Sequence, residues 1–137
     1  MLSPKRTKYR KYQKGRTTKI KQNLSKLGFG RFGIKSCECW RLSARTIEAV
    51  RRVITKKLKR QGKVWTCIFP DIPVTKKPAE VRMGKGKGSI NYWMARVSKG
   101  HILYEIDGVS EKVAFDAFQQ VQNKLPFPVT FVKYNNL

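Results

Sequence analysis

A short basic loop at residues 82–88 is the part of the sequence best suited to binding an anion. Three cations lie there among three glycines, in the order Arg-Met-Gly-Lys-Gly-Lys-Gly. Glycine has no side chain, so backbone N–H groups can approach a phosphate closely. The loop lacks the Gly-Lys-Ser/Thr ending of a nucleotide-binding P-loop and the spacing of a dinucleotide fingerprint. We expect RNA phosphate contacts here, with a solvated hairpin loop as the alternative; the loop comprises Arg82, Met83, Gly84, Lys85, Gly86, Lys87 and Gly88.

The first 35 residues form a second basic region, with twelve Lys and Arg and no acidic residue. Its charges repel one another and it has little apolar surface to bury, so it cannot fold alone. A polyanion would neutralise it, and its rings Tyr9, Tyr12, Phe29 and Phe32 are suited to stacking on bases. The cations expected to contact RNA here are Lys5, Arg6, Lys8, Arg10, Lys14, Arg16 and Arg31.

The composition of the whole chain favours the same kind of partner. Its 137 residues carry a formal net charge of +23, from 31 Lys and Arg against 8 Asp and Glu. A protein with this charge is expected to stay bound to a polyanion. The alternative is a solvated basic surface, as on a small secreted cationic protein, but the concentration of charge toward one end disfavours it.

Residues able to bind a metal or act as a nucleophile are few. Cys37 and Cys39 are separated by one residue, whereas zinc sites usually have C-x₂-C spacing, and only Cys67 and His101 remain as further ligands. Three cysteines do not form a disulfide framework, which favours a reducing compartment. The carboxylates at residues 105–111 fit turn and capping chemistry better than a nuclease site. We therefore expect no catalytic residue, no metal and no cofactor.

The sequence contains no run of 18 apolar residues, so we expect no membrane span. The N-terminus is basic and free of acid, as in a mitochondrial presequence. Pro4, Gly15 and the irregular Lys/Arg spacing disfavour the amphipathic helix that a presequence would form.

Two amphipathic helices are predicted to position the basic residues. The first spans about 44–61, with Ser43 as its N-cap and Gly62 as its C-terminal cap. Its apolar stripe consists of Ile47, Val50, Ile54 and Leu58, at spacings of three and four. Its other face either meets water or follows RNA phosphates, and we favour the RNA; the cations concerned are Arg45, Arg51, Arg52, Lys56 and Lys59.

The second helix is predicted at about 111–125, capped by Ser110 and ended by Pro126 and Pro128. β-rich segments lie at 34–42, 63–69, 90–97, 102–106 and 129–134, and residues 74–81 read as extended beyond the breaks at Pro70 and Pro73. This order predicts an α+β fold with two helices packed on an antiparallel sheet and a basic extended N-terminal arm. The predicted divisions are a basic arm with a glycine-rich turn (1–35), one α+β domain (36–134) and a tail (135–137).

A series of motifs connects these elements to one known family. In order they are Pro4-Lys5-Arg6-Thr7-Lys8, Gly28-Phe29-Gly30, Arg45-x-Ile47-Glu48-Ala49-x-Arg51-Arg52, Gly62-Lys63-Val64-Trp65, and Val81 through Gly88. From Met1 to about Phe131 the chain closely resembles the bacterial-type large-subunit ribosomal protein number sixteen. Residues 17–27 and Cys39-Trp40 depart from the family pattern, so RNA contacts are not carried over to them.

The resemblance implies two helices on an antiparallel sheet, an N-terminal arm and no catalytic activity. It implies binding to large-subunit rRNA beside the aminoacyl-tRNA site, near the peptidyl-transferase centre and among neighbouring large-subunit proteins. In the family, the loop matching residues 82–88 points toward bound tRNA. The alternative function is a general basic nucleic-acid-binding module outside the ribosome.

The resemblance also bears on location. Family members begin with the Pro-Lys-Arg-Thr-Lys motif, so the basic start is expected to belong to the mature protein. Residues 11–16, Cys37 and residues 95–98 look like those of mitochondrially encoded members. We therefore expect an organelle-encoded protein of the mitochondrial ribosome, with a plastid or the bacterial cytoplasm as alternatives.

Overall fold

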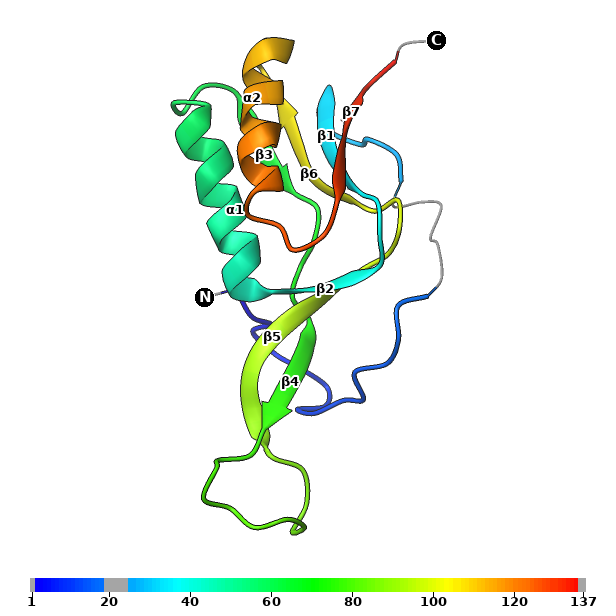
Figure 1. The fold of residues 1–137 in the computed structure, drawn as a ribbon, viewed down its shortest axis with the longest axis vertical. Helices are drawn as coiled ribbons and strands as arrows, with labels where there is room; N and C mark the ends of the chain where they lie inside the picture. The colour runs from blue at the N-terminus through cyan, green and yellow to red at the C-terminus, as the bar shows by residue number, and fades with distance from the viewer. Residues whose placement is uncertain (1, 19–24, 136–137) are drawn as a thin grey trace.

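The computed structural model describes residues 2–18 and 25–135, and these form an α+β fold (Figure 1). The elements are β1 (Phe32–Ser36), β2 (Trp40–Ser43), α1 (Ala44–Lys57), β3 (Lys63–Thr66), β4 (Ile72–Lys76), β5 (Ser89–Val97), β6 (Ile102–Asp107), α2 (Glu111–Gln122) and β7 (Val129–Lys133). The predicted fold class is confirmed. Two arm cations, Lys19 and Lys21, and most of the predicted tail lie outside the described residues.

The strands of the described region form two antiparallel sheets. One has four strands in the order β3-β6-β1-β7, and the other has three in the order β2-β5-β4. Both helices lie against the same side of the four-stranded sheet, while β4 and β5 extend away from the helices (Figure 1). The connection between β4 and β5 therefore forms one end of the molecule, and it contains the basic loop at residues 82–88.

The apolar stripe of α1 enters the core as predicted. Ile47, Val50 and Ile54 have no exposed surface, and Leu58 is 2% exposed. Across the interface, Tyr104 of β6 is fully buried and its hydroxyl donates a hydrogen bond to the carbonyl of Ile47 at 2.8 Å. Burial of the ring and satisfaction of its hydroxyl together fix α1 on the four-stranded sheet.

The single strand predicted at 34–42 is wrong, because the chain changes sheets there. β1 ends at Ser36, whose Oγ donates to the carbonyl of Glu38 at 2.5 Å, and β2 begins only at Trp40. This side-chain hydrogen bond stabilises a turn within an otherwise β-rich segment. Alternating β-formers alone do not reveal such a turn.

Both helices end earlier than predicted. α1 ends at Lys57 rather than at 61, since Lys59 and Arg60 adopt left-handed backbone conformations with φ of 52° and 64°. α2 ends at Gln122 rather than at 125, with Asn123 as its C-cap. At the N-termini, Ser43 accepts a hydrogen bond from the N–H of Thr46 at 3.3 Å, which confirms its capping role. Ser110 is the N-cap of α2 by backbone position, without a side-chain hydrogen bond.

Two further boundaries differ from the prediction. β3 ends at Thr66 instead of 69. Pro73, predicted to interrupt β structure, lies inside β4 opposite Trp93 of β5. β4 is an edge strand of its sheet, so a residue without an N–H donor is tolerated at this position.

Candidate nucleic-acid interface

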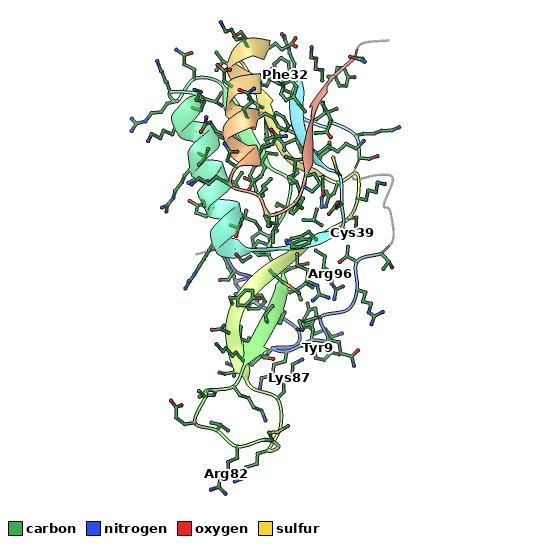
Figure 2. The ribbon with its side chains drawn as sticks, in the orientation of Figure 1. Tyr9, Phe32, Cys39, Arg82, Lys87 and Arg96 are labelled. Carbon is green, nitrogen blue, oxygen red and sulfur yellow. The ribbon has the colours of Figure 1, made fainter. Side chains whose placement is uncertain are left out.

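The basic loop is held away from the body of the protein by the β4–β5 hairpin. Arg82 lies at the far end of the loop and Lys87 near its base (Figure 2). Residues 82–87 are all exposed, and Met83 is 99% exposed. Gly84 and Gly86 have φ of +89° and +88°, which favours glycine, and a Cβ at either position would meet no atom within 4 Å. These two glycines therefore shape the loop backbone rather than make room for other parts of the protein.

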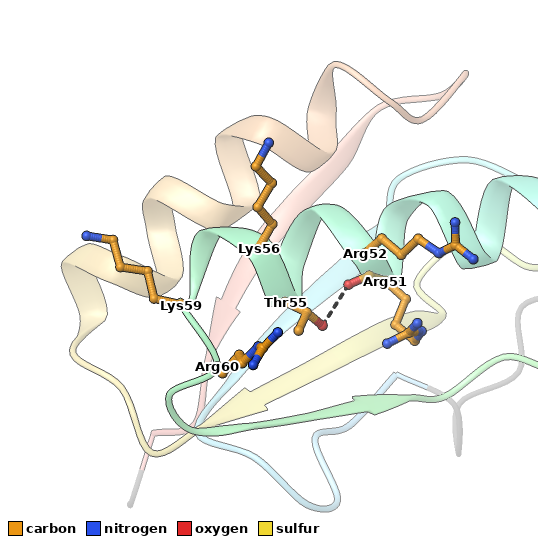
Figure 3. A pocket seen from close by; sticks show the side chains of 6 residues that line it. All are labelled: Arg51, Arg52, Thr55, Lys56, Lys59 and Arg60. Carbon is orange, nitrogen blue, oxygen red and sulfur yellow. Dashed lines mark hydrogen bonds between the residues drawn. The ribbon is translucent and has the colours of Figure 1, made fainter.

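A second cationic feature is an open hollow of about 470 Å³ along α1 and the turn that follows it (Figure 3). Its lining residues are Arg51, Arg52, Thr55, Lys56, Lys59 and Arg60. The hydroxyl of Thr55 donates to the carbonyl of Arg51 at 3.0 Å, so it is satisfied within the helix. Five cations around one concave surface match the charge of closely spaced phosphates. We refer to these six residues as the α1 hollow.

Glu48 determines how two of the predicted contacts are oriented. Arg51 donates to its carboxylate through Nε at 3.0 Å and Nη2 at 2.6 Å, and Arg52 donates through Nε at 3.2 Å. The hydrogen bond from Arg51 is the largest of the effects that lower the pKa of Glu48 to about 2. Arg51 is half-buried, and its guanidinium is largely engaged by Glu48. Arg52 keeps 74% of its side chain exposed.

The structure brings together only some of the α1 cations that were predicted to contact RNA. Arg52, Lys56 and Lys59 meet at the α1 hollow with Arg51, but Arg45 lies at the other end of α1, near Leu2. Arg60 belongs to the hollow although the sequence reading left it out of the contact set. The sequence signal for it is its place directly after Lys59, within the basic helix predicted at 44–61.

The N-terminal segment contacts the hairpin through its backbone carbonyls. Arg96 of β5 donates to the carbonyl of Lys14 at 2.9 Å and to that of Gln13 at 3.2 Å, and Arg41 of β2 donates to the carbonyl of Gly15. The cationic side chains of this segment remain exposed; they are Lys5, Arg6, Lys8, Arg10, Lys11, Lys14 and Arg16. Sequence reasoning missed Arg41 and Arg96. For Arg96 a signal existed, since it lies between apolar residues that alternate in a strand.

The four aromatic residues of the basic region differ in exposure. Phe32 is in the core, where its ring stacks on that of Phe131 with centroids 5.6 Å apart. The prediction that Phe32 is available to bases is therefore wrong, because β1 turns its side chain inward. Tyr9 is 66% exposed and Tyr12 38% exposed, while Phe29 is 68% exposed and stacks on Trp65.

Glu105 fixes the turn that carries Phe29. Its carboxylate, in a residue that is only 3% exposed, accepts hydrogen bonds from the successive N–H groups of residues 28, 29 and 30 at 2.6–3.2 Å. Burial by itself would raise the pKa of Glu105, but these backbone hydrogen bonds outweigh it and hold the pKa below its ordinary value. Glu105 thus differs from Asp107, whose carboxylate accepts from the N–H of Gly108 in the predicted turn, and from Glu111, which lies in the first turn of α2.

The cysteines occupy separate places in the fold. Burial and the neighbouring Glu105 carboxylate raise the pKa of Cys67 to about 12, so its sulfur stays a thiol at neutral pH. Cys37 lies 2.9 Å from the hydroxyl of Thr130, and the sulfur of Cys39 accepts from the N–H of Lys99 at 3.3 Å.

Within residues 2–18 and 25–135, no three His, Cys, Asp or Glu side chains lie close enough to hold a metal ion. In the same residues, neither helix has the length and apolar character needed to cross a membrane.

The fold and its cationic surfaces agree with a comparison to known families. A sequence model of the family described as Ribosomal protein L16p/L10e matches residues 4–132. The match includes the N-terminal segment, both sheets, the α1 hollow and the basic loop. The chain therefore belongs to the Ribosomal protein L16p/L10e family and is a structural constituent of the large ribosomal subunit.

Proposed function

We propose that this protein binds large-subunit rRNA through the α1 hollow and its N-terminal segment, and presents the loop at residues 82–88 to aminoacyl-site tRNA. The observation that supports this division is spatial. The end of α1 that carries the hollow and the tip of the basic loop lie at opposite ends of the molecule (Figure 1). The protein can therefore hold rRNA at the α1 hollow while the tip of the loop contacts a second RNA.

The rRNA contact is supported by the chemistry of the α1 hollow. Every described side chain that lines it is a cation except Thr55, and Arg52, Lys56, Lys59 and Arg60 are exposed. Arginine and lysine contacts of this kind position a protein on RNA without reading the base sequence. The exposed cations of residues 5–16 extend the same interaction to a segment without helix or strand.

The tRNA contact is supported by the form of the loop. Arg82 and Lys85 are exposed, and the β4–β5 hairpin places the loop that carries them away from the helices and the four-stranded sheet (Figure 1). In such a position they can contact a ligand that enters and leaves, because nothing in the core depends on them. Lys87 differs, since its Nζ donates to the carbonyl of Tyr12 at 2.6 Å.

Salt dependence tests the rRNA contact directly. If the full-length protein neutralises six to ten phosphates, its affinity for deproteinised large-subunit rRNA should fall by about 10³–10⁵ between 50 and 200 mM salt. Changing Arg52, Lys56 and Lys59 to Gln should weaken binding. It should also reduce the slope of log affinity against log salt concentration by the amount expected for about three phosphate contacts. An unchanged slope would refute the α1 hollow as a phosphate site.

A second variant separates the tRNA contact from assembly. Changing Arg82 and Lys85 to Gln should leave incorporation into large subunits intact, but slow aminoacyl-tRNA accommodation in translating ribosomes. Changing Lys5, Arg6, Lys8 and Arg10 to Gln should instead reduce incorporation. Failure of the loop variant to assemble would contradict this division of roles.

For location, we propose a mitochondrial ribosome on the basis of the similarities at residues 11–16, Cys37 and residues 95–98. Gentle lysis of isolated organelles and sedimentation through sucrose gives the test. The protein should travel with the large mitochondrial subunit and lose that association after ribonuclease treatment. Recovery with plastid or bacterial ribosomes would overturn the location, and a light peak unaffected by ribonuclease would overturn the ribosomal role.

A further inference from the structure

A stacked aromatic pair, made of the exposed Phe29 and the half-buried Trp65, lies outside the cationic surfaces described above. The rings of Phe29 and Trp65 stack with their centroids 5.9 Å apart and their planes inclined by 18°. Phe29 precedes β1, and Trp65 lies on β3, an edge strand of the four-stranded sheet. Although it contacts Trp65, Phe29 remains 68% exposed, which is unusual for a large apolar ring. Phe29 therefore presents much of its apolar ring to the surroundings.

The turn that carries Phe29 is fixed rather than loose. Three successive N–H groups, including that of Phe29 at 2.6 Å, donate to the buried carboxylate of Glu105. A Cβ on Gly30 would lie 2.7 Å from the carbonyl oxygen of Ile106, so the backbone approaches β6 as closely as glycine allows. Trp65 is opposite Glu105 in the β3–β6 pairing. Glu105 therefore fixes the turn that carries Phe29 and is also the strand neighbour of the residue that carries the second ring. This turn holds an exposed ring in a defined orientation, as a preorganised binding surface requires.

Each ring of the pair has a cation two residues away along the chain. The Nζ of Lys63 is 5.7 Å from the centroid of the Trp65 ring, and the side chain of Arg31 is 79% exposed two residues after Phe29. Arg31 reaches Asp107 at 3.6 Å but is left largely in water. A flat apolar ring with cations beside it matches a nucleotide, whose base stacks while its phosphates meet the cations.

We propose that Phe29, supported by Trp65, is a stacking site for an unpaired base of large-subunit rRNA, with Lys63 and Arg31 meeting the adjacent phosphates. This rests on the proposed rRNA binding and adds a contact that is not electrostatic. A double helix offers no exposed base face, so the site selects a loop, bulge or strand end. Stacking of one base on an aromatic side chain is worth about 5- to 150-fold in affinity.

Binding of full-length protein to deproteinised large-subunit rRNA tests the site. Phe29→Leu should lower the affinity about 5- to 150-fold without changing its salt dependence, because no charge is removed. Phe29→Tyr keeps a stacking ring and should restore the affinity. Phe115→Leu is the matched control: this 42% exposed ring contacts Phe118 and Phe131 and is followed by Asp116. Its affinity should equal that of the unmodified protein.

Ultraviolet cross-linking of intact large subunits gives an independent readout. Trypsin releases residues 27–31 as a peptide containing Phe29 as its only ring, and this peptide should carry a nucleotide adduct. Equal affinity of Phe29→Leu and unmodified protein, or the absence of the adduct, would overturn the stacking site while leaving rRNA binding intact. Equal losses in Phe29→Leu and Phe29→Tyr would also overturn it. If the unmodified protein fails to bind the rRNA, the proposed function itself fails as well.

Discussion

Lys11 and Lys87 join the N-terminal segment to the base of the basic loop. The Nζ of Lys11 donates to the carbonyl of Lys87 at 3.0 Å, and the Nζ of Lys87 donates to the carbonyl of Tyr12 at 2.6 Å. Arg96 adds its hydrogen bonds to the carbonyls of Gln13 and Lys14 farther along the same hairpin (Figure 2). RNA bound to the segment would therefore also restrict the hairpin that carries the loop.

Loss of Arg96 should free the N-terminal segment. Its hydrogen bonds are exposed, so each contributes about 1 kcal/mol, which corresponds to about a fivefold change in an opening equilibrium. We predict that Arg96→Ala increases the rate of tryptic cleavage after Lys11 and Lys14 at least fivefold in the free protein. Lys112→Ala, an exposed change on α2, is the control and should leave these rates unchanged. Equal rates in both variants would show that Arg96 does not hold the segment.

Glu105 should make the stability of the protein sensitive to acid. Its pKa is lowered in the folded state, so its stabilising effect is complete above the ordinary carboxyl value of about 4.3 and is lost as the pH falls through the folded-state value. Hydrogen bonds to a charged group contribute about 1.5–3 kcal/mol, so Glu105→Gln should lower the free energy of unfolding by about that amount at pH 7.

Urea unfolding at pH 7 and at pH 3 measures this effect. The difference in stability between the unmodified protein and Glu105→Gln should shrink on acidification, since protonation removes the same charge. Other carboxylates, Glu48 among them, affect both proteins equally and cancel in this difference. A difference that stays constant across this range would mean that the charge of Glu105 does not stabilise the turn.

The hydroxyl of Tyr104 should contribute to stability through its buried hydrogen bond to Ile47. Tyr104→Phe leaves that carbonyl with one partner fewer in a region without exposed surface, at a cost of about 1–2 kcal/mol. Thermal or urea unfolding measures the change. Tyr92→Phe removes a hydroxyl from a 38% exposed ring and should alter stability by less than about 0.5 kcal/mol. A comparable loss in both variants would refute a specific role for the buried hydroxyl.

The features predictable from sequence are the local ones. The stripe of α1 follows from spacing, and the exposed glycine-lysine loop follows from composition. The Glu105 turn could not be predicted, because it depends on β6 lying between β1 and β3, which brings residues 75 to 77 positions apart together. Phe32 was misassigned for a related reason, since its exposure is decided by the register of β1 against β7. Phe29 was predicted to be suited to stacking on bases, but its packing on Trp65 and the fixing of its turn by Glu105 could not be predicted, because both depend on how β3 pairs with β6.

Gly62 and Gly84 allow a comparison of two effects of glycine, because both have positive φ, +70° and +89°, in very different surroundings. A Cβ on Gly62 would lie 2.3 Å from the carbonyl oxygen of Asp107, whereas a Cβ on Gly84 would meet nothing within 4 Å. Alanine at Gly84 should therefore cost at most about 1 kcal/mol of backbone strain. Alanine at Gly62 adds overpacking against backbone that cannot rotate away, for a total of about 3 kcal/mol. Urea unfolding of the two variants gives the difference, and equal destabilisation would mean that backbone conformation alone, rather than the close approach of residue 62 to β6, requires glycine there.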